Sequence, residues 1–367
     1  MMLTVLSLAS LVSLPAAPLQ AAPCLRPTRP GTQVQGNVRI CPGRYRISDR
    51  SERGVIIAAS SGTRIDLTNV VLESGDSVPS RFVGVGIASR GVDAVTINGG
   101  VIRGYRFGVR IEGGRSHRVS GTDLSGSRSQ VIRSTPARPD PADRLDVVRP
   151  DSFERHGGGI LLKRTSAASI TGITSRSSQN GIALVEVRGS YIADNDLAGN
   201  NGWGIHLWRS AGNIIARNQV DHTRRCESQV PAADCGAAAL LVREASDSNT
   251  FVDNDLRGSS LGFVLAGARQ QVRPSVGNMV LRNDAAAALR AAFTTVLSDR
   301  FQSGVSEATS SKPVIFDGGL CSSSGPAGSK VQKVIALIRR SVADETMNVS
   351  PACRGGSSHG IRIAIDR

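Results

Sequence analysis

The residues of this sequence best suited to chemistry stand at fixed distances after a recurring glycine. An aliphatic residue follows this glycine each time, at Gly86, Gly108, Gly159, Gly181 and Gly204. Charged and aromatic side chains stand two and four residues after these glycines, and the corresponding position of the repeat after Gly204 is shifted by one residue. The set is Arg90, Arg110, Glu112, Lys163, His206, Trp208 and Arg243. Because these positions alternate with aliphatic ones, a strand would present them on one outward flank.

This flank has the residue types that chemistry on an acidic sugar requires. β-Elimination and epimerisation both remove a proton beside a carboxylate, so a cation must neutralise the carboxylate and a base must reach the proton. We predict His206 as the base, because an imidazole titrates near neutrality, and Lys163 and Arg243 as the catalytic cations. Substrate binding is assigned to the remaining members of the flank: Trp208, which could stack on a sugar face, Arg110, Glu112 and Arg90.

Simpler interpretations of the same flank stay open. An outward histidine on a strand is commonly an ordinary surface residue. Trp208 could pack beneath the loop between Arg133 and His156 instead of binding a sugar. The columns of arginine could serve only to balance Asp and Glu.

A second candidate site is the charged segment from Asp221 to Glu227. His222 is a further candidate catalytic residue, and Asp221 is a candidate substrate-binding carboxylate. A disulfide between Cys226 and Cys235 would tie this segment into a loop, and loops often carry function. The same residue types ligate metals, but His222 stands alone in the sequence, so no metal site is predicted.

The repeat that positions these residues has a regular length. Successive glycines are 22, 51, 22 and 23 residues apart, and the long interval contains a Pro-, Arg- and Asp-rich excursion assigned to residues 131–157. Within a repeat, aliphatic residues alternate, and a second aliphatic pair is followed by Asn at positions 195, 218, 254 and 283. Asn tolerates the left-handed backbone of a tight corner, and stacked Asn side chains can hydrogen-bond to one another.

Each repeat is therefore predicted to be one rung of two or three short strands. A single rung cannot bury its aliphatic face, whereas stacked rungs bury a continuous core. A leucine-rich repeat has a similar length, but its L-x-x-L-x-L spacing is absent.

The Gly-Ile-x-Leu and Asn pattern, above all the run from Asn200 to Leu207, resembles bacterial right-handed parallel β-helix repeat proteins of the pectin-lyase-like superfamily. The resemblance covers about residues 54–284 and implies an all-β, right-handed parallel β-helix. The superfamily includes polysaccharide lyases, mannuronan C5-epimerases, glycoside hydrolases and the periplasmic nitrous-oxide-reductase maturation protein. Enzymes of this fold bind sugar chains along such a flank.

The sequence departs from the known enzymes of that superfamily. It lacks the Asp-Pro-His-Asp motif of mannuronan epimerases, the clustered Asp residues of calcium-dependent pectate lyases and a convincing outward carboxylate pair for a hydrolase. Nothing resembles a Met- or His-rich copper site. No cofactor is therefore predicted, and calcium has no support.

The start of the chain and its cysteines predict export. An apolar stretch from Leu3 to Leu14, followed by small residues, predicts a signal peptide over 1–22, although no basic residue precedes it. No later apolar run is long enough to span a bilayer. Six Cys in an exported chain favour disulfides over a metal site, and an elongated stack favours local pairing of the neighbours: Cys24 with Cys41, Cys226 with Cys235, and Cys321 with Cys353.

Four regions follow from these patterns: the signal peptide, an N-terminal cap over 23–53, the β-helix over 54–284 and a C-terminal cap and tail over 285–367. Helices are expected only in the last region. The Ala-rich segment 285–296 and the amphipathic segment 330–346 are the candidates.

The charge of the chain limits the kinds of partner that it could bind. The net charge is +14, and nearly all the positive charge is Arg, since the chain has only four Lys. This indicates an anionic partner or simply genome composition and solubility. Export and the lack of interleaved aromatic and basic residues argue against a nucleic-acid partner. Two functions remain: a secreted or periplasmic lyase or C5-epimerase of an acidic polysaccharide, or a noncatalytic glycan-binding or scaffold protein. A monomer is expected in either case.

Overall fold

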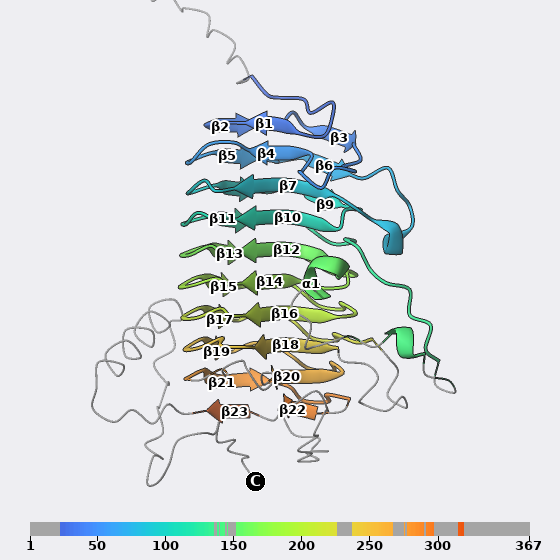
Figure 1. Cartoon of the computed structure of the whole chain (residues 1–367), viewed down its shortest axis with the longest axis vertical. Coiled ribbons are helices and arrows are strands. Elements are labelled where there is room, and N and C mark those ends of the chain that lie inside the picture. Colours follow the sequence, from blue (N-terminus) through green and yellow to red (C-terminus); the bar gives the residue numbers. More distant parts are fainter. Residues whose placement is uncertain are drawn as a thin grey trace, which may run out of the picture.

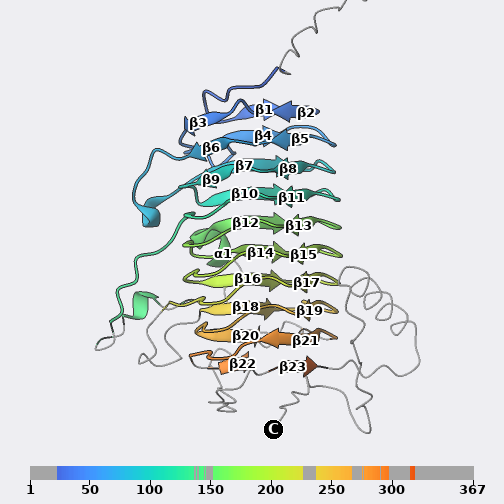
Figure 2. The same cartoon turned by 180° about the vertical axis from the view of Figure 1, so that it is seen from behind.

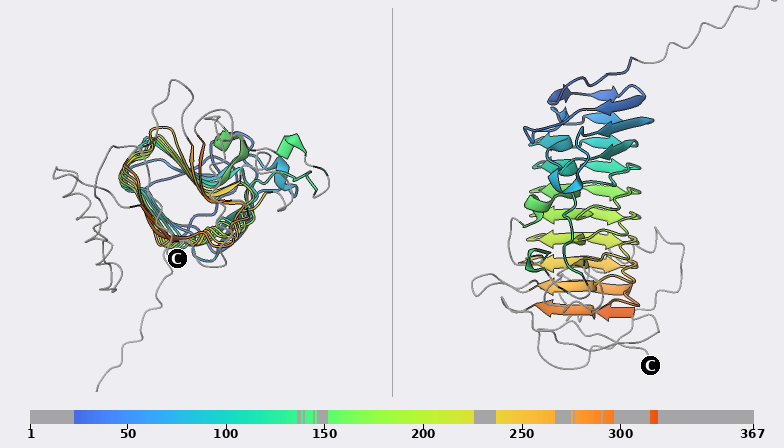
Figure 3. Two further views of the ribbon diagram at one scale, coloured as in Figure 1. Left: turned by 90° about the horizontal axis from the view of Figure 1, so that it is seen from below. Right: turned by 90° about the vertical axis from the view of Figure 1, so that its right-hand side faces the viewer.

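The computed structural model describes residues 23–135, 138, 140–143, 145, 152–225, 237–266, 275, 277–289, 291–296 and 315–318. Over these residues the chain winds into a stack of rungs, and each rung adds short strands to the long sheets on its sides (Figure 1, and from behind in Figure 2). Seen along the axis, the rungs superpose in a closed outline around the core (Figure 3). The fold is the right-handed parallel β-helix that the family resemblance implied.

Three sheets run along the stack, and their neighbouring strands pair in parallel except for the last pair of the second sheet. The first sheet contains β1 (Thr32–Val34), β4 (Ile56–Ala58), β7 (Val85–Arg90), β10 (Phe107–Glu112), β12 (Gly158–Lys163), β14 (Ile182–Val185), β16 (Trp203–Trp208), β18 (Ala238–Arg243), β20 (Leu261–Ala266) and β22 (Ala291–Val296). The second contains β2 (Asn37–Arg39), β5 (Arg64–Asp66), β8 (Thr96–Asn98), β11 (Arg118–Ser120), β13 (Ser169–Thr171), β15 (Tyr191–Ala193), β17 (Ile214–Ala216), β19 (Thr250–Val252), β21 (Met279–Asp284) and β23 (Ile315–Gly318). The third contains β3 (Gly43–Arg46), β6 (Val70–Glu73) and β9 (Val101–Arg103).

The inward positions of the strands form the core. Ile182 pairs with Ile205 and Leu184 with Leu207, and all four side chains are fully buried. Removing one such side chain from water contributes about 1.5–3 kcal/mol. The period of two therefore fixes which residues of the first sheet face the core and which face outward.

The recurring Asn residues form a buried ladder along the stack, as the sequence predicted. The side-chain amide of Asn195 donates to the Asn218 side chain at 2.8 Å, Asn218 to Asn254 at 2.9 Å, and Asn254 to Asn283 at 2.7 Å. Each amide also donates to a backbone carbonyl of the stack, so these buried polar groups are satisfied.

Beyond β9 the third side continues as a column of single-residue bridges. The bridges link Asp123, Thr174, Asp196, Gln219, Asp255 and Asp284, one per rung. This column brings the short turn that follows each of these residues to the same corner of the stack, between the third side and the first sheet.

The described structure differs from the predicted regions in three places. Residues 32–46, expected in the cap, already pair in parallel with the next rung. The predicted helix over 285–296 is wrong, because residues 291–296 form β22 and extend the first sheet. Helix is also not confined to the C-terminal region, because α1 (Ser152–His156) lies in the excursion 131–157, beside the stack (Figure 1). Two 3-10 turns, η1 (Pro79–Arg81) and η2 (Pro141–Asp143), lie outside the strands.

The predicted disulfide between Cys24 and Cys41 is present, with an S–S distance of 1.98 Å. It ties the start of the described chain to the first rung, between β2 and β3. The signal segment 1–22, the other four Cys and the predicted helix 330–346 lie outside the described residues.

A charged pair across two rungs yields a stability prediction. The Arg217 guanidinium donates to both carboxylate oxygens of Asp194 at 2.7 Å and to the Tyr191 hydroxyl. These bonds hold the pKa of Arg217 above its ordinary value. We expect Arg217→Gln to lower the free energy of unfolding by about 1 kcal/mol, and by less in concentrated salt, which screens the pair. Urea unfolding at two salt concentrations measures the loss of stability and its salt dependence. Arg64→Gln is the neutral control, because Arg64 is exposed on β5. An equal loss in the control would contradict the assignment.

Candidate functional site

The register of the predicted flank is confirmed. Parallel pairing aligns Arg110 with Ala88 and Leu161, and His206 with Ala183. It also places Arg243 directly beside Trp208. The side chains therefore occupy the outward columns of the first sheet that the glycine spacing indicated.

The predicted exposure of His206 and Arg243 is wrong. His206 is fully buried, beneath Phe153 of the excursion, and Arg243 is 1% exposed. The His206 ring lies 5.8 Å from the ring of Phe153 on α1 and 5.1 Å from that of Trp203. Burial, and then the nearby charge of Arg243, hold the pKa of His206 well below its usual value. A base in this position cannot reach a polysaccharide at the surface.

The other residues of the flank are engaged with the protein itself. Arg110 and Arg90 both pair with Glu112. Lys163 pairs with Glu154 of α1 at 2.5 Å. These ion pairs fit the interpretation that the columns of charge balance one another.

Trp208 is likewise held from two sides. Its indole N–H donates to Glu244 at 2.7 Å, and the Arg209 guanidinium lies 4.6 Å from the ring centroid. The ring is half-buried and packs against the apolar cluster that contains Phe153. One ring face is therefore covered by Arg209, and the ring is engaged with the protein itself.

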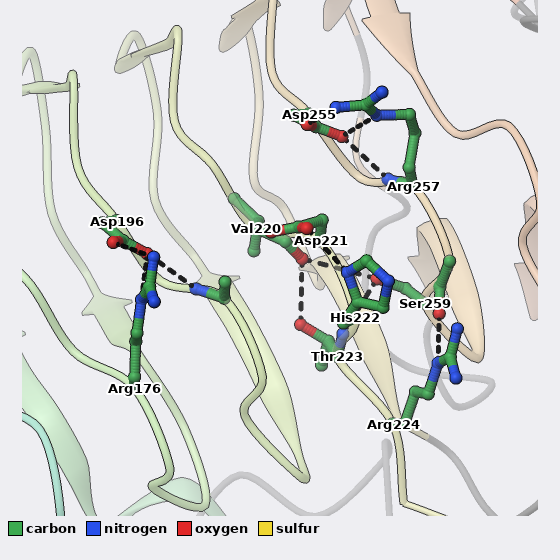
Figure 4. Close-up of polar contacts among 12 residues, drawn as sticks. Arg176, Asp196, Val220, Asp221, His222, Thr223, Arg224, Asp255, Arg257 and Ser259 are labelled. Carbon is green, nitrogen blue, oxygen red and sulfur yellow. Dashed lines mark hydrogen bonds and ion pairs between the residues drawn. The ribbon is translucent and has the colours of Figure 1, made fainter.

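The second predicted cluster contains the pair that the structure does bring together. His222 Nδ1 lies 2.6 Å from Asp221 Oδ2 (Figure 4). The Asp221 side chain is 11% exposed, whereas that of His222 is 57% exposed. Because the carboxylate accepts the Nδ1 proton, this hydrogen bond assigns the tautomer that leaves a lone pair on Nε2, directed away from Asp221. The pair is therefore a buried carboxylate that orients an exposed base.

His222 occupies a position that its neighbours in the stack fill with glycine. The Gly199 amide donates to the Asp221 carbonyl and the His222 amide to the Arg257 carbonyl, so Gly199 and Gly258 lie one rung before and after His222. All three have left-handed backbones, with φ of 68° at Gly199, 54° at His222 and 61° at Gly258. This conformation is costly for a residue with a side chain. The imidazole consequently projects between two rungs that have no side chain beside it.

Three arginines lie along this corner of the stack. Arg257 pairs with Asp255 at 2.5 Å and with Asp284 at 3.7 Å, and Arg176 pairs with Asp196 (Figure 4). Arg224 is exposed and donates through Nε to the Gly258 carbonyl at 2.5 Å. In the part of the chain that the structure describes, Arg224 forms no ion pair.

Gly258 forms the floor between the base and this arginine. A Cβ placed there would lie 3.1 Å from His222 Nε2 and 3.0 Å from an Arg224 guanidinium nitrogen. The two groups therefore meet above the buried backbone of Gly258.

Sequence reasoning named Asp221 and His222 but missed Arg176, Arg224, Arg257 and Gly258. The available signal was the third-side column, in which Asp196 and Asp255 are followed three residues later by Gly199 and Gly258. The same spacing from Gln219 leads to His222. Glu227, at the end of that segment, lies outside the described residues.

The fold and site define a secreted or periplasmic β-helix protein, and comparison with known proteins agrees. The family model described as periplasmic copper-binding protein (NosD) matches residues 52–284, and the chain belongs to this family. The family and the Cys24–Cys41 disulfide both indicate a location outside the cytoplasm. None of the described helices is long and apolar enough to cross a membrane.

Several solved structures show more distant similarity. DFA-IIIase from Arthrobacter chlorophenolicus A6 is 14% identical, with a TM-score of 0.43 over 72% of this chain and 68% of that one. The A-module of mannuronan C-5 epimerase AlgE6 from Azotobacter vinelandii is 12% identical, with a TM-score of 0.40 over 73% of this chain and 71% of that one. The Dettilon tailspike protein gp208 is 12% identical, with a TM-score of 0.39 over 68% of this chain and 47% of that one, so the chain spans under half of the tailspike's length. No curated protein matches.

The copper in the family description does not fit the described part of this chain. Nowhere in that part do three or more His, Cys, Asp or Glu side chains converge as metal ligands would. His222, the exposed histidine of the site, has only Asp221 as a partner of these types. No copper chemistry is therefore derived for this site.

Proposed function

We propose that this protein binds an acidic polysaccharide at the corner that carries His222, and that the Asp221–His222 pair removes a proton beside the sugar carboxylate. The observation that carries the proposal is an exposed imidazole, oriented by a buried carboxylate at 2.6 Å and set between two glycine rungs. Gly199 leaves room for a chain to lie against the ring, because nothing lies within 4 Å of the place that a Cβ would take there. Arg224, across Gly258, supplies the charge that such a substrate needs.

The reaction that fits a single base is β-elimination. His222 Nε2 accepts the proton on the carbon next to the carboxylate, while Arg224 stabilises the negative charge that develops on the carboxylate oxygens. The electron pair forms a carbon–carbon double bond and expels the glycosidic oxygen of the adjacent carbon. The imidazolium, balanced by Asp221, then returns its proton to that oxygen. Epimerisation would need a second acid on the opposite face of the sugar.

The net charge of the chain supports an anionic partner. Its value of +14 favours approach of a polyanion at long range. Arg176 and Arg257 extend the positive charge one or more rungs to either side of His222, although each is partly balanced by Asp. A glycan lying along the stack would meet Arg224 on the rung of His222 and Arg257 on the next rung, and of these two only Arg224 forms no ion pair within the described residues.

The alternative is a noncatalytic glycan-binding or scaffold protein. The ion pairs of Arg90, Arg110 and Lys163 favour it, because they use charge within the protein. Binding of an acidic glycan without any product would support this alternative and remove the catalytic step.

The binding part of the proposal is tested with Arg224→Gln. We expect this variant to bind an acidic oligosaccharide about tenfold more weakly, because a charge-assisted contact to the carboxylate is lost. Calorimetric titration of the full chain with oligosaccharides of alginate, polygalacturonate and a glycosaminoglycan measures the affinity. Ultraviolet absorbance detects unsaturated products in the same samples.

Arg118→Gln on the exposed face of β11 is the matched control and should retain wild-type affinity. A wild-type protein that binds none of the three glycans would refute the proposal. So would equal weakening in the two variants, because it would show that only net charge matters.

A further inference from the structure

A small open cleft on the outside of the stack has a composition that points to a ligand. Its volume is about 250 Å³, and it lies beside residues 126–135, which run along the outside of the rungs toward η2 (Figure 1). The residues that line it come from η1, from this run and from η2: Ser80, Arg128, Gln130, Val131, Arg133, Ala142 and Asp143. None of them belongs to the Asp221–His222 site.

Two of the lining residues are arginines with unused hydrogen-bonding capacity. Arg128 donates through one terminal nitrogen to the Phe82 carbonyl at 3.3 Å, while its Nε is buried and has no partner among the described residues. Arg133 is exposed, and within the described structure its side chain forms no ion pair. This Nε is closed to solvent, so an anion in the cleft would bind the terminal nitrogens of Arg128.

The single acidic residue of the lining does not neutralise these arginines. The Asp143 carboxylate accepts the backbone N–H groups of Arg133 at 2.8 Å and of Ser134 at 2.5 Å. Burial opposes ionisation of Asp143, but these hydrogen bonds and the nearby Arg225 charge hold its pKa below the ordinary value. Its charge is therefore directed at the loop backbone.

A third arginine lies behind the lining. Arg225 is 4% exposed and donates to neutral acceptors: the Asp143 carbonyl, the Asn201 carbonyl at 3.1 Å and the Gln130 side-chain oxygen at 2.5 Å. None of these acceptors carries a charge. Arg128, Arg133 and Arg225 thus share the Asp143 carboxylate. Glu52, which also acts on Arg128, is paired with Arg106, so a surplus of positive charge remains around the cleft.

We propose that this cleft binds an oxyanion, of the carboxylate, sulfate or phosphate kind, between Arg128 and Arg133. Planar guanidinium groups match such anions in geometry as well as in charge. The Ser80 hydroxyl adds a neutral hydrogen-bonding group at the rim. The inference does not depend on the chemistry assigned to His222.

The test titrates the full-length protein with sodium sulfate, sodium phosphate and galacturonate at constant ionic strength. We expect saturable binding of at least one of them, and binding about tenfold weaker in Arg133→Gln. Arg133 is exposed, so this variant should fold even if Arg128→Gln, whose side chain is partly buried, does not. Arg81→Gln is the matched control, because Arg81 is exposed on η1 but does not line the cleft. It should bind within about twofold of wild type.

The three ligands separate the sources of the anion. Binding of sulfate or phosphate alone assigns a free tetrahedral ion, whereas tighter binding of galacturonate assigns the carboxylate of a sugar, and both support the cleft. Absence of saturable binding for all three, or equal affinities in Arg133→Gln and Arg81→Gln, would overturn the proposal. His222→Gly should leave this binding unchanged, so failure here is distinguishable from failure of the proposed function.

Discussion

Replacing His222 by glycine is expected to abolish turnover of an acidic glycan while leaving the β-helix folded. Loss of a positioned base lowers a rate by about 10²–10⁴-fold. Glycine is the residue that the stack already carries at this position one rung before and one rung after, with the same left-handed backbone. The change therefore removes the imidazole and relieves backbone strain at once, and the free energy of unfolding should change by less than about 1 kcal/mol.

The measurement compares initial rates of unsaturated product formation, affinity and urea unfolding for His222→Gly and the wild type. Asp221→Asn is the companion variant. It keeps the shape of the carboxylate but removes the charge that balances the imidazolium, so it should lower kcat more than it changes KM. Full activity of His222→Gly would show that this pair is structural and that the base lies elsewhere.

The sequence predicted the register of the stack because register depends on local patterns. Glycine spacing and period-2 aliphatics aligned Lys163, Trp208 and Arg243 in one column, as the strand pairing confirms. The Asn ladder followed from the same repeat, since each Asn bonds to its equivalent in the adjacent rung.

Exposure could not be predicted in the same way, because it depends on contacts distant in sequence. The outer face of β16 is covered by Phe153, which lies 53 residues before His206 in the chain, on a helix of five residues. Such a helix is too short to leave a periodic signal. Nothing in the repeat itself distinguishes an outward position that faces solvent from one beneath an excursion.

The site at His222 was only partly predictable for a related reason. The third side of the rungs beyond β9 pairs through single residues, so it lacks the alternating aliphatics that reveal a strand. Without that register, Gly199, His222 and Gly258 could not be aligned. The Arg224 and Arg257 side chains that flank the imidazole consequently went unrecognised.

The buried His206 leads to a prediction on stability and pH. Both ring nitrogens are buried without a hydrogen-bond partner in the described structure, and burial holds the pKa of this imidazole well below its ordinary value. At pH above about 6.5 the imidazole is neutral in both the folded and the unfolded chain, so it contributes no pH dependence. As the pH falls below that value, the unfolded chain takes up a proton that folded His206 does not, and the folded state loses stability until the pH reaches the lowered pKa.

We therefore expect His206→Leu to stabilise the protein and to remove this acid sensitivity. Leucine occupies the equivalent outward positions at 161 and 241, where it is fully buried. The gain should be about 1 kcal/mol at pH 7.5, from removing unpaired polar atoms, and about 2 kcal/mol more at pH 5, from the proton linkage. Urea unfolding of wild type and variant at both pH values measures it. The pKa of His117 is also lowered by burial, but this histidine is common to both proteins and cancels. If the variant is less stable than wild type and has the same pH dependence, the imidazole has a hydrogen-bonding partner and the prediction is wrong. If the variant binds and turns over the glycan like wild type, the chemistry lies away from β16.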